Sequence, residues 1–266
     1  MRYFARIRYV GTDFCGFQVQ KNSRTVQGTL NAATEKLFGC PCMITGCSRT
    51  DSGVHAEEFC LTITPTEASA RAIPPHALPA AILPYLPPDV SLYYASEAPE
   101  GFHPRHDALG KEYRYRIRYG ALPDPFLAGR VWQVPYRLSD SDFSRMQAAA
   151  PHFIGKHDFT AFMCTAADVT DCVRTIQALT LSREGNNVTV SVTADGFLYN
   201  MVRIITGTLF EIGRGNRTVE SVSEAIRSTS RPRAGMTAPP DGLYLHKVFY
   251  PDELLVLLDG NARNEE

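Results

Sequence analysis

Apolar and polar residues alternate along several short stretches of this chain, which is the two-residue period of a β-strand with one buried face. The strictest alternation is KEYRYRIRY at 111–119. Its lysine, tyrosines and isoleucine share one face, and its glutamate and three arginines share the other. The same pattern, or a short apolar run, predicts further strands at 2–10, 42–49, 58–64, 187–194 and 242–250.

Other stretches carry apolar residues at the three- to four-residue spacing of an α-helix. This spacing predicts a helix over 26–38, with Thr25 as its N-cap and Gly39 as the residue that ends it. Six prolines between positions 73 and 92 allow only short, interrupted helix there. Further helices are predicted at 139–150, 200–212 and 219–228.

Strands and helices follow one another without the long spacing of βαβ units, which favours an α+β fold built on antiparallel sheet. The tetrapeptide Arg-Ile-Arg-Tyr occurs at 6–9 and again at 116–119, as expected if two similar halves each begin with such a strand. We predict an N-terminal half over 1–104, a C-terminal half over 105–250 and an acidic tail over 251–266.

Composition places the chain among ordinary globular proteins. It has 266 residues, of which 44% are hydrophobic and 21% charged. No apolar run approaches the ~20 residues that span a bilayer, and the N-terminus lacks the apolar core of a signal peptide. Its seven cysteines form no CxxC pair, and no compact His/Cys set completes a zinc site. Reduced thiols and a cytoplasmic location without bound metal are therefore expected.

The charge distribution leaves two interpretations open. A net charge of −1 does not favour general nucleic-acid binding. However, residues 101–120 carry five Lys/Arg against two acids, and residues 201–235 carry six Arg against three acids. A fold could gather these basic segments into one groove, or they could be scattered and solvated.

The segment 46–56, GCSRTDSGVHA, is the strongest candidate for chemistry. Asp51 stands among small residues directly after an apolar strand, where a carboxylate is sterically open. Arg49 lies two residues earlier, so in an extended chain both side chains point the same way. The alternative is a solvent-facing Asx-turn, since Asp-Ser-Gly is common turn chemistry.

SRTDSGVHA resembles the RTDxGVHA signature of the tRNA pseudouridine synthase A family. Five further blocks resemble family segments and occur in family order over about 250 residues. They are FHPRHDALGKEYRYRI (102–117), HDFTAF (157–162), CVRTI (172–176), GFLYNMVRIITGTLFEIG (196–213) and APPDGLYL (238–245).

The resemblance implies an active site drawn from several segments. Asp51 corresponds to the catalytic nucleophile, and Arg203 to the arginine that pairs with it. Tyr113 corresponds to the aromatic residue that stacks on the target base, Leu243 to a wall of the uracil pocket, and Arg49 to a residue beside the flipped nucleotide. Without their neighbours, Tyr113 and Leu243 read as core residues and Arg203 as a solvated helix residue.

The implied reaction is the conversion of uridine to pseudouridine in the anticodon stem-loop of tRNA, at positions 38–40. It has no redox step and no group donor, so no cofactor is expected. Whether the carboxylate attacks covalently or assists glycal formation stays open. Tyr113 is also a candidate for proton transfer. Candidates for contacts to the RNA backbone are Lys21, Arg24, Arg105 and Lys111.

For the fold we predict two ferredoxin-like halves whose antiparallel sheets join into one continuous mixed sheet, with helices on one side and a basic cleft on the other. The resemblance further implies a homodimer acting on tRNA, with no DNA and no membrane partner.

The arginine face of 111–119 either binds RNA or covers a helix with its aliphatic stems, and the second role is favoured because Tyr113 lies on the opposite face.

Several residues depart from the family pattern: Val10, Phe17, Ser48 and Ser52 replace the usual Asp, Trp, Gly and Ala. They leave the catalytic residues in place but allow an altered target position.

Two other functions compete with an isomerase. One is a non-catalytic RNA-binding module of the same ancestry. The other is a hydrolase that uses Asp51, Ser52 and His55, although residues so close in sequence seldom form a triad.

Overall fold

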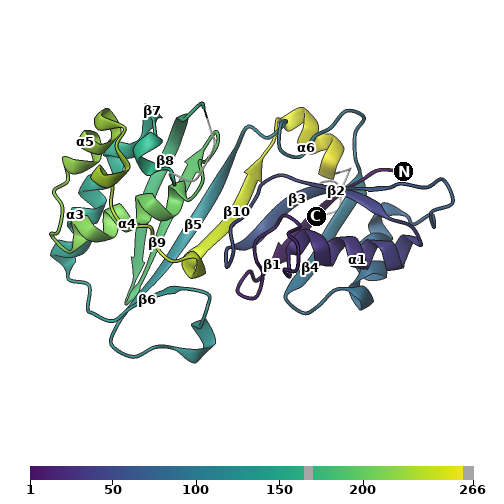
Figure 1. Cartoon of the computed structure of the whole chain (residues 1–266), viewed down its shortest axis with the longest axis horizontal. Helices are drawn as coiled ribbons and strands as arrows, with labels where there is room; N and C mark the ends of the chain where they lie inside the picture. The colour runs from purple at the N-terminus through teal and green to yellow at the C-terminus, as the bar shows by residue number, and fades with distance from the viewer. Residues whose placement is uncertain (165–169, 260–266) are drawn as a thin grey trace. The chain divides into compact units, whose positions relative to one another are not determined.

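The computed structural model describes residues 1–164 and 170–259. Within these ranges the chain forms ten β-strands, six α-helices and several short 3₁₀ turns (Figure 1). It divides into two compact units, Met1–Leu109 together with the chain from Leu245 onward, and Gly110–Tyr244. The predicted halves instead divide the chain at 104 and keep the last strand with the second half.

The first unit has the strand order β4-β1-β3-β10. β1 pairs antiparallel with β3 and β4, and β2 pairs antiparallel with β3. Antiparallel pairing lets short turns and single helices connect neighbouring strands. The predicted strand at 42–49 ends three residues early, at Gly46, where the loop bearing Asp51 begins. The strands are β1 (Tyr3–Tyr9), β2 (Cys42–Gly46), β3 (His55–Pro65), β4 (Val90–Glu97) and β10 (Leu243–Phe249).

Helix α1 (Val26–Phe38) has the limits that the sequence predicts. The Thr25 hydroxyl accepts a hydrogen bond from the Gly28 N–H at 3.2 Å, and Gly39 ends the helix with a φ of 78°. Phe38 packs on Tyr3 of β1, with ring centroids 5.4 Å apart, so α1 covers the face of β1 on which Tyr3 lies. The proline-rich stretch forms only the short α2 (Leu78–Ile82) and two 3₁₀ turns, as predicted.

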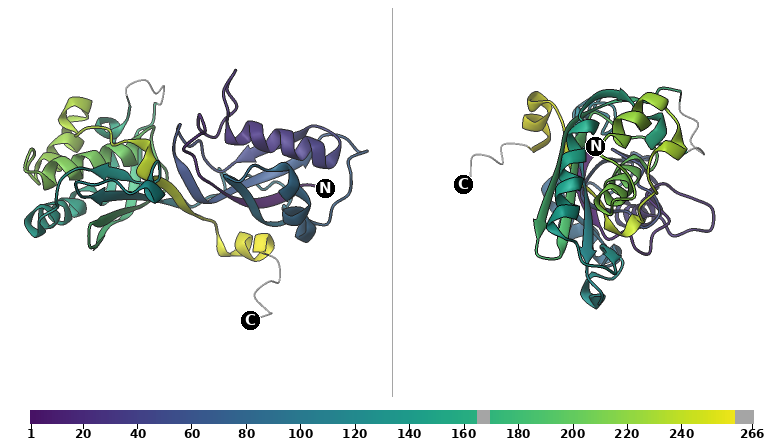
Figure 2. Two further views of the ribbon diagram at one scale, coloured as in Figure 1. Left: turned by 90° about the horizontal axis from the view of Figure 1, so that it is seen from below. Right: turned by 90° about the vertical axis from the view of Figure 1, so that its left-hand side faces the viewer.

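The C-terminal helix α6 (Asp252–Asp259) lies on the opposite face of this sheet (Figure 2, left). Arg6, which points away from the α1 side of β1, forms an ion pair with Asp259 at 2.5 Å. The Tyr94 hydroxyl donates to the Leu258 carbonyl at 2.8 Å. α6 is therefore an exception to the predicted arrangement of helices on one side. The rest of the predicted acidic tail, 260–266, lies outside the described residues.

The second unit has the strand order β5-β9-β8-β7, all antiparallel, while β6 pairs parallel to β5. The result is a mixed sheet, and the predicted α+β class is confirmed. From Lys111 to Tyr119, β5 alternates between buried and partly exposed residues, as predicted. The strands are β5 (Gly110–Tyr119), β6 (Trp132–Val134), β7 (Gly155–Asp158), β8 (Val173–Glu184) and β9 (Asn187–Ala194).

Helices α3 (Asp140–Ala149), α4 (Met201–Gly213) and α5 (Ser221–Ser228) gather on one face of this sheet (Figure 2, right). α4 is almost entirely buried, and α3 packs against it. No helix in the described part of the chain has the length and apolar character that crossing a membrane requires.

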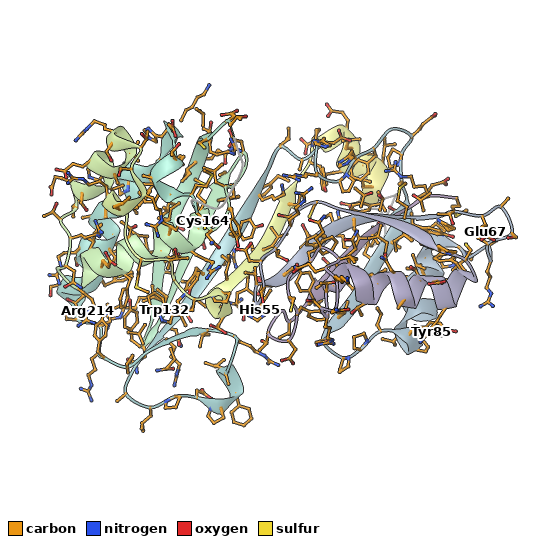
Figure 3. All side chains as sticks on the ribbon, viewed as in Figure 1. His55, Glu67, Tyr85, Trp132, Cys164 and Arg214 are labelled. Atoms are coloured by element: carbon orange, nitrogen blue, oxygen red, sulfur yellow. The ribbon has the colours of Figure 1, made fainter. Side chains whose placement is uncertain are left out.

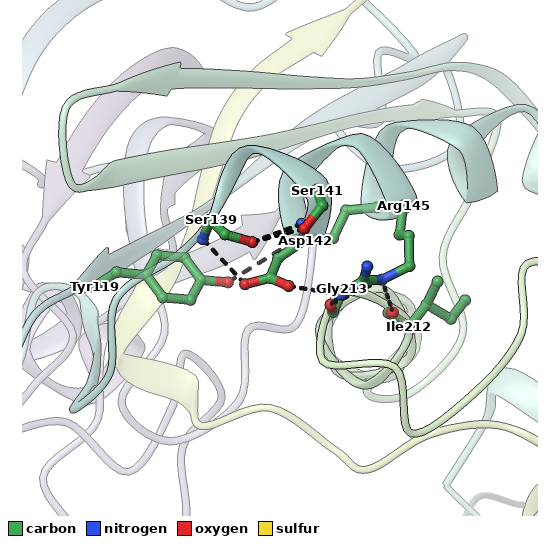
Figure 4. A network of polar contacts seen from close by, with 8 residues as sticks. Tyr119, Ser139, Ser141, Asp142, Arg145, Ile212 and Gly213 are labelled. Atoms are coloured by element: carbon green, nitrogen blue, oxygen red, sulfur yellow. Dashed lines mark hydrogen bonds and ion pairs between the residues drawn. The ribbon is translucent and has the colours of Figure 1, made fainter.

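A polar network holds α3 against the end of α4 (Figure 4). Ser139 and Asp142 form a reciprocal capping box at the start of α3. Arg145 bonds the Asp142 carboxylate and donates to the Gly213 carbonyl, both at 2.6 Å. Burial tends to raise the pKa of Asp142, but hydrogen bonds from Ser139 and the charge of Arg145 outweigh it, and the pKa lies below its ordinary value. The network fixes one end of α4, whose other end carries Arg203.

Candidate active site

Asp51 lies in the loop between β2 and β3. Its carbonyl accepts a hydrogen bond from the Val54 N–H at 3.2 Å, and Gly53 between them has a φ of 80°. Only glycine adopts this left-handed conformation without strain. The loop is thus the turn that its composition suggests, and it leaves Asp51 half-buried.

The loop is held by a second segment of the first unit, residues 11–17. The N–H groups of Gly53 and Phe17 bond the carbonyls of Phe14 and Thr50, each at 3.1 Å. A Cβ on Gly11 would lie 2.0 Å from the Val54 carbonyl oxygen, so only glycine fits at position 11. These backbone contacts fix Asp51 without using its carboxylate.

His55 (labelled in Figure 3) begins β3 and is only 1% exposed. Its Nδ1 accepts a hydrogen bond from the Gly11 N–H at 2.9 Å, which places the proton of the neutral ring on Nε2. The Ser52 hydroxyl donates to the Phe14 carbonyl at 3.3 Å. Both side chains tie the loop to residues 11–14, which removes the support for a hydrolase that uses Ser52 and His55.

In the second unit, Arg203 lies in the first turn of α4. Its Nε donates to the Ala238 carbonyl at 2.8 Å, and its Nη1 donates to Oδ1 of Asn200 at 2.7 Å. Asn200 takes a left-handed φ of 62° just before the helix. Two acceptors therefore orient the guanidinium, a role that the sequence analysis did not predict for Asn200 or Ala238.

Tyr113 lies on β5 and is 7% exposed. Its ring meets Phe197 edge to face, with centroids 4.9 Å apart. Two residues further along the same face, the Tyr115 hydroxyl donates to the Pro239 carbonyl at 2.6 Å. Burial raises the pKa of Tyr115 far above its ordinary value, although the charge of Arg203 acts in the other direction. Tyr115 is therefore a neutral donor that anchors the segment leading to Leu243.

Leu243 follows that segment, at the start of β10, and is 6% exposed. Gly242 before it has no room for a side chain, because a Cβ would lie 2.5 Å from the Arg116 carbonyl and 2.7 Å from the Tyr115 ring. Arg203 and Tyr115 both bond the 238–239 backbone. The segment 238–243 of the second unit thus connects the position of Arg203 to that of Leu243. Asp51 belongs to the first unit, and the grouping of Asp51, Tyr113, Arg203 and Leu243 in one site stays a prediction.

The predicted RNA-backbone contacts differ in their surroundings. Lys21 and Arg105 are exposed. Arg24 is also exposed, but it forms a two-point ion pair with Asp89 at 2.8 and 2.9 Å. Lys111, at the start of β5, is only 9% exposed. Lys21 and Arg105 are therefore the more accessible of the four to a phosphate.

The arginine face of β5 is occupied within the second unit. Arg114 bonds Glu112 at 2.8 Å, Arg118 lies 3.8 Å from Asp124, and Arg116 lies over the Tyr244 ring at 4.1 Å. Glu112, Asp124 and Tyr244 do not lie on helices, whereas Tyr119 on the opposite face of β5 contacts Met146 of α3. The prediction that the arginine face covers a helix is therefore not supported, although these arginines do have partners within the unit.

A cavity of about 250 Å³ in the first unit is lined by Arg49 and Arg105, together with His103 and His106. The sequence analysis did not assign a role to the two histidines. The signal that could have found them is their spacing around Arg105 in FHPRHD.

Comparison with known proteins shows the family to which the chain belongs. The family model described as tRNA pseudouridine synthase matches residues 149–251, which include Arg203 and Leu243. The chain is thus a pseudouridine synthase by class. It is 41% identical over 239 residues to tRNA pseudouridine synthase A of Halalkalibacterium halodurans, covering 90% of this chain and 88% of the relative. It is 41% identical to the protein of that name from Acetivibrio thermocellus, covering 92% and 97%. The chain belongs to the tRNA pseudouridine synthase A family.

A structural match is far more distant. It is a chain from the structure of an H/ACA RNP bound to a substrate RNA containing 2′-deoxyuridine, with 12% identity and a TM-score of 0.36. The match covers 94% of this chain and 49% of that one. A likeness this weak does not define the fold.

Proposed function

We propose that this protein converts uridine to pseudouridine in the anticodon stem-loop of tRNA, at positions 38–40, with Asp51 as the catalytic carboxylate and no cofactor. The observation that supports this most strongly is the family relationship, which extends over 90% of the chain. Asp51, Tyr113, Arg203 and Leu243 all stand at the positions where the family motifs have their functional residues.

The reaction breaks the N1–C1′ bond, turns the uracil and joins C5 to C1′. The hydrogen on C5 leaves as a proton to solvent, and N1 gains a proton, so the composition is unchanged. Asp51 acts as an ionised carboxylate, either by covalent attack or by assisting glycal formation. Arg203 pairs with it and keeps it charged when the bound RNA excludes water. Arg203 donates hydrogen bonds to the Ala238 carbonyl and to Oδ1 of Asn200, and these two acceptors hold its guanidinium in place.

Tyr113 stacks on the target uracil, and its hydroxyl exchanges a proton with the sugar or C5. Leu243 closes the pocket with an apolar side chain. Taking the base out of its stack costs a few kcal/mol. Contacts from Arg49, Lys21 and Arg105 to the RNA backbone offset that cost. The protein works as a cytoplasmic homodimer on tRNA.

The test is to incubate the purified protein with unmodified tRNA transcripts and to map pseudouridine by carbodiimide modification and primer extension. The wild type is expected to produce stops at positions 38–40, and Asp51→Asn is expected to produce none while still binding tRNA. Tight binding without stops in the wild type would instead identify a non-catalytic RNA-binding module.

A further inference from the structure

The cavity of about 250 Å³ in the first unit has an apolar floor and a polar, basic rim. Phe17 forms the floor and stacks on Phe59, with ring centroids 4.3 Å apart and planes at 24°. Gly46 lies directly behind it, because a Cβ there would come within 2.8 Å of both rings. The floor is therefore rigid. The volume is below the ~300–1,000 Å³ of pockets that enclose drug-sized ligands, so the cavity suits a small group.

Charge on the rim is of one sign. Arg49 and Arg105 line the cavity with His103 and His106, and none of the described lining residues is an aspartate or glutamate. Over residues 1–164 and 170–259, neither arginine has an acidic side chain within ion-pair distance. Arg24 in the same unit, by contrast, is paired with Asp89. Like charges gathered in a concave site attract an anion.

The two histidines are held by a tight turn. Nδ1 of His103 accepts hydrogen bonds from the N–H groups of Arg105 at 3.1 Å and His106 at 3.2 Å. The neutral His103 ring therefore carries its proton on Nε2 and has a donor there. The carboxylate of Asp107 accepts a hydrogen bond from the His103 backbone N–H at 2.8 Å, so this acid is engaged by the backbone of the turn. The two imidazole rings lie 4.1 Å apart. Burial, and then the neighbouring His106, lower the pKa of His103.

We propose that this cavity is a phosphate-binding subsite that takes one phosphate group of the tRNA backbone, held by Arg49, Arg105, His103 and His106. The proposal rests on the function proposed above. The planar fork of an arginine matches phosphate oxygens and binds them through two hydrogen bonds. An anion here also relieves the repulsion between the two guanidinium groups. Arg105 and the two imidazoles thus form a defined binding site rather than part of a general basic surface.

Its location sets which phosphate is bound. Arg49 precedes Asp51 by two residues, a distance that extended chain covers in at most about 7 Å. A phosphate held beside Arg49 therefore belongs to the target nucleotide or to its immediate neighbour. The subsite fixes the register of the RNA strand relative to the catalytic carboxylate.

The first experiment measures tRNA affinity against salt concentration for wild type, Arg105→Gln and His106→Asn. Arg71→Gln is the matched control, because Arg71 is an exposed arginine of the same unit that does not line the cavity. Arg105→Gln is expected to weaken binding about tenfold at low salt and to reduce the slope of log K against log salt by about one. Arg71→Gln is expected to leave the slope unchanged. Equal slopes for Arg105→Gln and wild type would overturn the proposal.

The second experiment titrates the wild-type protein with inorganic phosphate while the imidazole resonances of its seven histidines are followed by NMR. His103 and His106 are expected to shift in a saturable way, the other five to stay in place, and an anticodon stem-loop RNA to displace the phosphate. Saturable shifts that the RNA does not compete with would mean a small-anion site and contradict the tRNA assignment. The titration does not depend on catalysis, so a wild type that forms no pseudouridine would defeat the proposed function and leave the subsite to be judged by phosphate binding.

Discussion

Tyr113 is the residue at which stacking and proton transfer can be separated. Tyr113→Phe keeps the flat ring and removes the hydroxyl, whereas Tyr113→Leu removes both. If the hydroxyl transfers a proton, Tyr113→Phe lowers the single-turnover rate by about 10²–10⁴-fold and leaves tRNA affinity unchanged, and Tyr113→Leu lowers both. The measurement is single-turnover pseudouridine formation alongside filter binding. A full rate for Tyr113→Phe would leave the ring with a stacking role only.

Gly53 tests whether the turn geometry positions Asp51. Its φ of 80° is costly for any other residue, so Gly53→Ala is expected to destabilise the protein by about 1 kcal/mol and to lower turnover strongly. Gly39→Ala is the matched control, since Gly39 has a similar φ of 78° at the end of α1 and open space around it. We expect a similar loss in urea unfolding and normal turnover for Gly39→Ala. Equal turnover in both variants would show that the turn does not position Asp51.

At the scale of single residues, the sequence predicted those turns and caps that depend only on neighbouring residues. The turn at Asp-Ser-Gly follows from composition, as does the Thr25 cap. The partners of Arg203 could not be predicted, because Ala238 lies 35 residues away and contributes only a carbonyl. The engagement of His55 by Gly11 is likewise a contact of high sequence separation that no local pattern encodes.

At the scale of secondary-structure elements, helix α3 begins at an N-cap side chain whose contribution to the free energy of unfolding can be measured. Ser139 accepts from the Asp142 N–H at 3.1 Å as the N-cap (Figure 4). Ser139→Ala is expected to lower the free energy of unfolding by about 1 kcal/mol. Ser144→Ala removes the same atom from an exposed position inside the helix and is expected to be neutral or slightly stabilising. Urea unfolding of both variants checks this, and equal stabilities would contradict the capping role.

Period and capping predicted the long, regular elements well. The helices α1, α3, α4 and α5 lie within two residues of the predicted limits, and the β5 alternation is confirmed. The strands β4, β6, β7 and β8 were not predicted. β8 has only two buried residues in twelve, Ile176 and Leu179, so its apolar signal is weak. β4 begins at the end of the proline-rich stretch, where the prolines obscure the alternating pattern that would predict the start of a strand.

At the scale of the whole molecule, the C-terminal strand explains why domain limits are hard to predict. β10 begins with Leu243 and Tyr244 in the second unit and continues from Leu245 in the first. The Val248 N–H of β10 donates to the Glu58 carboxylate, 190 positions away in the sequence. Sequence order alone keeps such a strand with its neighbours. The basic cleft stays a prediction.

The proposed homodimer is also a property of the whole molecule. Sedimentation velocity at micromolar concentration is expected to show a single species of twice the 29.5 kDa chain mass. Because the dimer is inferred from the family and not from a periodicity in the sequence, a monomer at these concentrations would contradict it without affecting the assignment of Asp51.

The central claim is that Asp51 drives the exchange of an N1 link for a C5 link on uracil. Since that exchange expels the hydrogen on C5, the most direct measurement is tritium release from tRNA transcribed with 5-tritiated uridine. Wild type is expected to release tritium in proportion to the target uridines, and Asp51→Asn to release none while binding the same tRNA. Release by Asp51→Asn at the wild-type rate, or none by the wild type, would contradict the account.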